Sequence, residues 1–244
     1  MKIAFLGNSG SIQGLEGSNT ALAVCEEGSL IVVDASGSPA EALTRSGLDP
    51  LDIDLVLLTH AHVDHIYALP SLIHNLYLMG RKRGLDIAAN SATLEIARSL
   101  VNAFALPLKK GIFPIAFIDL GEGSLDAGPI HVQSFAVNHG IPTNGFTFTC
   151  MGRKLTYMAD CNASTPIPAC SIGSDALVHE ACLGFKADHS SPSEAAECAS
   201  AMKAGKLFLV HLPQDRQQRA KILDEAKAAF PESTIPEIME QIEI

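Results

Sequence analysis

The chain has 244 residues and carries 17 Lys and Arg against 27 Asp and Glu, a formal net charge of −10. This acidic balance argues against general binding to nucleic-acid backbones, because that affinity rests largely on Lys and Arg displacing counterions. The 47% hydrophobic and 18% charged fractions are those of an ordinary globular protein rather than a disordered one. We expect residues 1–244 to form one α/β domain.

The N-terminal segment Met1–Leu6 breaks into Gly and Ser too early for a signal-peptide core, and no apolar run long enough to span a membrane follows. The six cysteines are scattered without a Cys-x-x-Cys pair, so we expect reduced thiols. The expected location is the cytoplasm, with no membrane partner.

In the first half of the chain, short apolar segments bounded by Gly, Asp or Ser alternate with helical ones. Strands are expected at 2–6, 21–25, 30–34 and 55–59. Helices are expected at 38–46, 66–80 and 91–105. Pro70 falls in the first turn of the second helix, where proline is tolerated, and Ser91 is the candidate N-cap of the third.

The second half repeats this alternation. Strands are expected at 130–137, 145–150, 154–159, 175–180 and 206–211. Helices are expected at 192–204, capped by Ser190 or Ser191, and at 215–229, ended by Pro231. Strands and helices in this order predict two sheets packed together with helices outside them.

The segment Thr59–His65, with the sequence Thr-His-Ala-His-Val-Asp-His, follows a predicted buried strand. In an extended chain, residues two apart face the same side and lie about 6–7 Å apart. His60 and His62 can therefore converge on one metal ion. Asp64 continues that face and His65 lies where the chain turns into the next helix, so both are expected to reach a second ion.

Three further candidate ligands each follow a predicted strand: His139, Asp160 and His211. With the residues of the motif they make five His and two Asp, enough for two ions with positions left open for water. Imidazole and carboxylate ligands suit Zn²⁺, with Mn²⁺ and Fe²⁺ as alternatives. Two such ions, about 3.5–4 Å apart, can share a hydroxide nucleophile.

The motif at residues 60–65, followed by the three later ligands in this order, resembles the metallo-β-lactamase superfamily. The resemblance implies an αβ/βα sandwich, with two mixed β-sheets, helices on the outer faces and the metals at one edge. It assigns the first ion to His60, His62 and His139, the second ion to Asp64, His65 and His211, and the bridging position to Asp160.

Within that superfamily the chain is most similar to ribonuclease Z, and the similarity covers most of its length. The matching stretches are Phe5–Gly10, Asp64–Pro70 with Ala68 in place of a glycine, Val178–Ala181, His189–Ser191 and the close of the chain, 229–244. The resemblance implies that His189 gives a proton to the leaving oxygen and that Asp64 also steers the attacking hydroxide. Glu180 and His179 are expected to orient the ligands by hydrogen bonds.

Two departures from ribonuclease Z bear on the substrate. The tRNA-processing members carry a long arm between the residues that match His139 and Asp160, but here these positions are only 21 apart in sequence. Those members also have a Pro-x-Lys-x-Arg-Asn loop near the N-terminus, whereas residues 12–19 of this chain contain no cation. Both losses, added to the net charge, remove groups that would hold a large polyanion.

We therefore expect a dinuclear metal-dependent hydrolase that acts on a small phosphodiester or ester through a metal-bound hydroxide. The alternative is ribonuclease Z activity on tRNA 3′ ends, and lactam hydrolysis ranks below it because no export signal is present. An alternative of another class is a non-catalytic metal-binding or sensing module. A homodimer is implied by the family resemblance alone.

Residues 81–83 (Arg-Lys-Arg) form the only tight basic cluster. They follow a predicted helix, where cations complement the negative end of the helix dipole. The structural interpretation is therefore preferred to a phosphate-binding one.

Overall fold

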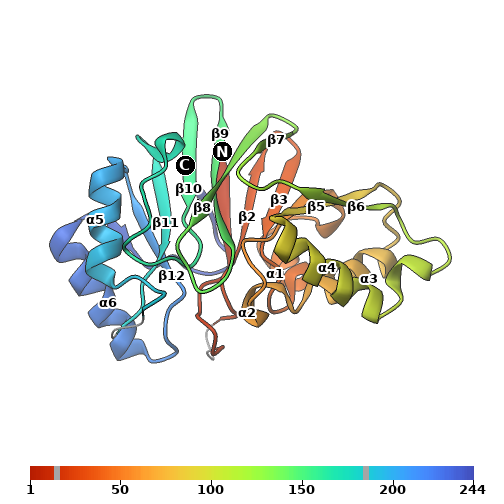
Figure 1. The fold of residues 1–244 in the computed structure, drawn as a ribbon, viewed down its shortest axis with the longest axis horizontal. Coiled ribbons are helices and arrows are strands. Elements are labelled where there is room, and N and C mark those ends of the chain that lie inside the picture. Colours follow the sequence, from red (N-terminus) through yellow and green to blue (C-terminus); the bar gives the residue numbers. More distant parts are fainter. Residues whose placement is uncertain (14–16, 184–186) are drawn as a thin grey trace.

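Two seven-stranded sheets form the centre of the computed structural model, which describes residues 1–13, 17–183 and 187–244 (Figure 1). The first sheet has the order β14-β1-β2-β3-β4-β5-β6. Its strands are β1 (Lys2–Gly7), β2 (Ala21–Glu26), β3 (Ser29–Val33), β4 (Ile53–Leu57), β5 (Leu85–Ala89), β6 (Ile115–Asp119) and β14 (Gln241–Glu243). The pairs from β14 to β3 are antiparallel and those from β3 to β6 are parallel, so this sheet is mixed.

The second sheet has the order β13-β12-β11-β10-β9-β8-β7. Its strands are β7 (Ser124–Ala127), β8 (Ile130–Val137), β9 (Thr143–Cys150), β10 (Arg153–Tyr157), β11 (Ala176–Glu180), β12 (Leu207–Val210) and β13 (Ser233–Thr234). Strands β7 to β10 pair antiparallel, and β10 to β13 pair parallel. The second sheet is therefore mixed as well.

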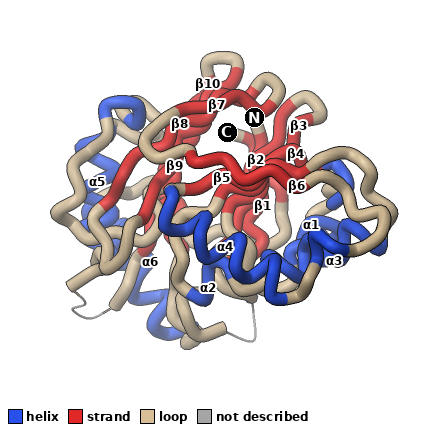
Figure 2. Tube along the Cα trace, turned by 45° about the vertical axis from the view of Figure 1, so that its right-hand side comes forward, coloured by secondary structure: helices blue, strands red, loops and turns tan. Residues whose placement is uncertain are grey.

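Helices lie on two opposite sides of the strands (Figure 2). The first sheet is accompanied by α1 (Pro39–Arg45), α2 (Val63–Ile66), α3 (Leu69–Leu78) and α4 (Ser91–Ala103), and the second by α5 (Pro192–Met202) and α6 (Arg216–Ala229). Short 3₁₀ helices occupy Pro50–Asp52, Leu106–Leu108 and Ala169–Ser171. Within the described ranges, no helix combines the length and apolar character needed to cross a membrane.

The hydrophobic core has three layers, because both faces of each sheet are covered. In β1, Ile3 and Phe5 point to the space between the sheets, and Ala4 and Leu6 point to the helices, as the two-residue period of a strand requires. The Phe5 and Phe208 rings, from opposite sheets, lie 5.2 Å apart. This helix–sheet–sheet–helix arrangement confirms the expected four-layer αβ/βα sandwich.

Several predicted elements are shifted. The strand expected at 55–59 is β4, which ends at Leu57, so Thr59 and His60 lie in the loop beyond it. The helix expected at 66–80 is divided into α2 and α3, with Pro70 in the first turn of α3. Asn90, not Ser91, caps α4, and its side chain accepts a hydrogen bond from the backbone N–H of Thr93.

Candidate metal centre

The candidate ligands come together at one edge of the sandwich, where β4, β8, β10 and β12 end. His60 and His62 lie in the loop after β4, and Asp64 and His65 lie in α2, below the sheets in Figure 1. His139, Asp160 and His211 follow β8, β10 and β12, respectively. The prediction that Asp64 continues an extended face is wrong, because α2 begins at Val63 and carries Asp64 in its first turn.

One group of three imidazoles faces a common point. His62 Nδ1 lies 3.0 Å from His60 Nε2 and 3.1 Å from His139 Nε2. Three convergent imidazole nitrogens are a donor set that holds a divalent transition metal. The structure therefore places together the three residues that the resemblance assigned to the first ion.

A second group contains Asp64, His65 and His211. Asp64 Oδ2 lies 3.6 Å from His65 Nε2 and 3.5 Å from His211 Nε2. Asp160 lies between the two groups, because its Oδ2 is 3.1 Å from His211 Nε2, 3.5 Å from His65 Nε2 and 4.0 Å from His60 Nε2. One carboxylate thus reaches ligand nitrogens of both groups.

Several of these polar atoms are buried without a hydrogen-bond partner in the described part of the chain: Asp64 Oδ2, His65 Nε2, Asp160 Oδ1 and His211 Nε2. A buried donor or acceptor left unpaired costs free energy, so four such atoms within one site require an explanation. A divalent cation held by Asp64, His65 and His211 would pair three of these atoms: Asp64 Oδ2, His65 Nε2 and His211 Nε2. The residues present therefore fit the metal that the ligand pattern implies.

Asp34 and Thr59 contact the candidate ligands on the side away from the site, and neither residue was predicted from the sequence. Asp34 Oδ2 lies 2.7 Å from His65 Nδ1, and the Thr59 backbone N–H and hydroxyl both donate to the same carboxylate. The Thr59 hydroxyl also lies 2.9 Å from His60 Nδ1. Contacts at Nδ1 fix each ring so that Nε2 faces the site. The available signal was an Asp directly after the apolar strand β3.

Glu180 and His189 form a pair beside the second group. Glu180 is buried at the end of β11, and its Oε2 lies 2.7 Å from His189 Nδ1. The His189 ring stacks on that of His211, with centroids 5.2 Å apart. Glu180 Oε2 is 3.8 Å from His211 Nδ1, so its hydrogen bond orients His189 rather than a ligand. His179 is turned away, with its Nδ1 2.8 Å from the Glu180 carbonyl oxygen.

The imidazoles of the site fall into two classes, one with lowered and one with raised pKa. Burial and the neighbouring imidazoles lower the pKa of His60 to about 2, and burial also lowers the pKa of His139. Burial acts to lower the pKa of His65 too, but the carboxylates of Asp160 and Asp34 outweigh it and raise that pKa to about 10. His60 and His139 are thus neutral at pH 7, with a nitrogen lone pair available to a cation.

Comparison with known proteins agrees with this geometry. A family model described as "Beta-lactamase superfamily domain" matches residues 30–212. A ribonuclease Z of Thermococcus kodakarensis is 30% identical over 161 residues, which are 66% of this chain and 50% of that relative. A ribonuclease Z of Bradyrhizobium diazoefficiens is 27% identical over 96% of both chains.

Among solved structures, the metallo-β-lactamase fold protein YhfI from Bacillus subtilis superimposes with a TM-score of 0.83. The superposition covers 100% of this chain and 99% of that one at 22% identity, which bears on the fold alone. The family match covers most of the chain, and the chain therefore belongs to the β-lactamase superfamily.

Proposed function

We propose that this protein is a hydrolase that uses two divalent cations, Zn²⁺ by preference, to cleave a small phosphodiester or ester. The position of Asp160 carries the proposal, because its Oδ2 lies within 4.0 Å of ligand nitrogens from both groups. A carboxylate so placed can bridge two ions. The ligands would be His60, His62 and His139 for one ion and Asp64, His65 and His211 for the other, with Asp160 shared.

Two ions bound here would supply an activated water and a positive field for the developing charge. The chain's own contribution is proton transfer and orientation. Glu180 accepts the hydrogen bond from His189 Nδ1, which leaves His189 Nε2 to deliver a proton to the leaving oxygen. Stacking on His211 keeps the His189 ring next to the second group of ligands.

The fold around the site supports a small substrate. Strands β9 and β10 occupy Thr143–Cys150 and Arg153–Tyr157, so the chain between His139 and Asp160 is used almost entirely for sheet pairing. No segment is left there for an arm that could grip a folded RNA. Of the N-terminal stretch 12–19, residues 14–16 lie outside the described residues.

The test is hydrolysis by the purified protein after loading with Zn²⁺ or Mn²⁺. The substrate panel should contain cyclic nucleotides, bis(4-nitrophenyl) phosphate, carboxylic esters and a precursor tRNA. We expect turnover of at least one small phosphodiester or ester, abolished by chelation and by Asp160→Asn. If the metal-loaded protein cleaves no member of the panel, the hydrolase proposal fails.

The second candidate function is tRNA 3′ processing. It is favoured by the Bradyrhizobium relative, which carries the name ribonuclease Z and aligns over 96% of both chains. Discrete cleavage of the precursor tRNA at its 3′ side, faster than any small substrate, would make this the function. Random or absent RNA cleavage beside rapid turnover of a small phosphodiester would exclude it.

A further inference from the structure

Cys182 lies between a proposed metal ligand and the pair that holds the proton donor. Its Sγ is 3.7 Å from His211 Nδ1 and 3.5 Å from Glu180 Oε2, and the residue is buried. The backbone N–H of Cys182 donates to the Ser190 carbonyl oxygen at 2.9 Å. Cys182 is thereby fixed against the segment that carries His189.

The Cys182 sulfur lies between His211 and Glu180, two side chains that make no direct hydrogen bond with each other. His211 Nε2 faces Asp64 and Asp160, so Nδ1 is the nitrogen that carries the proton when Nε2 binds a cation. The distance of 3.8 Å from Nδ1 to Glu180 Oε2 is too long for a hydrogen bond. A thiol can accept from Nδ1–H and donate its own S–H to the carboxylate.

We propose that Cys182 is a positioning residue that joins the second group of ligands to the proton donor. The contacts run without a break from His211 through Cys182 and Glu180 to His189. The inference rests on the proposed hydrolase function, but its first consequence concerns metal binding. The thiol holds the His211 ring with Nε2 toward Asp160. Loss of the thiol therefore frees the ring and weakens binding of the second ion.

The test compares Cys182→Ala, which removes the linking group, with Cys182→Ser, which keeps a donor and an acceptor. Cys198→Ala is the matched control, because this thiol lines a separate cavity of about 200 Å³ beside α5. Each protein is titrated with Co²⁺, and the visible absorption of the bound ion reports the two binding steps separately. We expect Cys182→Ala to lower the Co²⁺ affinity of the second binding step by about 10–100-fold and to leave the affinity of the first step unchanged.

The serine variant should restore the second step to within about threefold of the parent protein, and the control should match the parent. Equal affinity of Cys182→Ala and the parent at both steps would overturn the inference, as would equal weakening of both steps. If Cys182→Ala does not fold, Cys182→Val and Cys182→Thr, which differ mainly in one hydroxyl, replace the pair with the same criteria. Because the titration needs no substrate, its failure is distinct from a failure to find hydrolysis.

Discussion

Asp34 and His65 form a fully buried pair, with Oδ2 and Nδ1 2.7 Å apart and no side-chain exposure on either partner. Asp34 directly follows β3 and has a left-handed backbone conformation, at φ +63°, whereas His65 lies in α2. The carboxylate also accepts from Thr59, whose hydroxyl reaches His60. One buried carboxylate therefore supports a proposed ligand in each metal group.

Replacing Asp34 by Asn should weaken metal binding about 10–100-fold, the usual cost of losing a carboxylate behind a ligating histidine. Asn tolerates a positive φ, so the backbone can stay as it is. The amide cannot supply the negative charge, and its N–H can reverse the tautomer of His65 so that Nε2–H points into the site. Competition with a chromophoric chelator measures the affinity.

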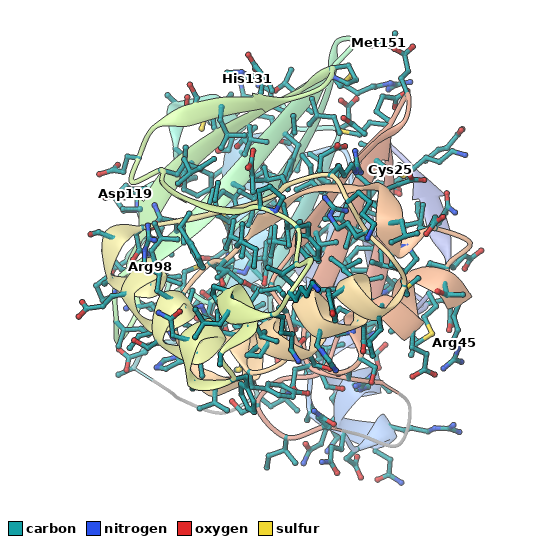
Figure 3. All side chains as sticks on the ribbon, turned by 90° about the vertical axis from the view of Figure 1, so that its right-hand side faces the viewer. Cys25, Arg45, Arg98, Asp119, His131 and Met151 are labelled. Carbon is teal, nitrogen blue, oxygen red and sulfur yellow. The ribbon has the colours of Figure 1, made fainter. Side chains whose placement is uncertain are left out.

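Asp126→Asn is the control, because Asp126 Oδ1 lies 2.6 Å from His131 Nδ1 and neither residue is a candidate ligand. Figure 3 shows His131 at the outer surface of the molecule. Both side chains of that pair are exposed, so its loss should leave metal affinity unchanged. Equal affinities for Asp34→Asn and Asp126→Asn would show that the buried pair does not support the site.

Metal uptake should become tighter as the pH rises. Although burial opposes it, Asp160 and Asp34 raise the pKa of His65 to about 10, so the metal-free protein carries this proton at neutral pH. A cation bound through Nε2 must displace it, which gives an affinity that rises at least about tenfold per pH unit between pH 6.5 and 8.5. The slope is steeper if His211 also releases a proton, because Asp160 and Asp64 outweigh burial and raise the pKa of His211 as well. Calorimetry in two buffers of different ionisation enthalpy measures the released protons. A pH-independent affinity with no proton release would contradict this assignment.

The convergence of the candidate ligands was predictable because it depends on short-range spacing and on strands that end at the same edge of a sheet. The motif at residues 60–65 is contiguous, and His139, Asp160 and His211 each follow a strand whose carboxyl end meets the same edge. The role of Asp34 was not predictable, since its partner His65 is 31 residues away and an Asp after a strand is also an ordinary turn residue.

Predictions from local hydrophobic periodicity were wrong where contacts with a neighbouring element determine the structure. Asp64 fits a two-residue strand pattern, yet α2 begins at Val63 and places it on a helix. Strands β6 and β7 were missed because they are partly exposed and have no clean apolar alternation. They are strands because β5 and β8 offer them backbone partners, which is information outside their own sequence.

His189→Ala should lower kcat by about 10²–10⁴-fold on substrates with a poor leaving group, because the proton donor is lost. The loss should be much smaller for 4-nitrophenolate, which departs without a proton. Metal content should stay at the parent value, since His189 belongs to neither ligand triad. His74→Ala, outside the site on α3, serves as the control. An equal loss of kcat for both leaving groups would show that His189 does not transfer the proton.

Arg81 should matter for stability and not for substrate binding. Its side chain is only 3% exposed, and its guanidinium donates to the backbone carbonyls of Leu51, Ile53 and Gly84. Arg81→Met removes the Arg81 donor from all three carbonyls, of which Leu51 keeps a second side-chain donor, Arg83, and should lower the free energy of unfolding by about 2–4 kcal/mol. Lys82→Ala, at an exposed neighbour, should change it by less than about 0.5 kcal/mol. Urea unfolding checks both values, and a higher KM for a phosphodiester with unchanged stability would instead make Arg81 a phosphate ligand.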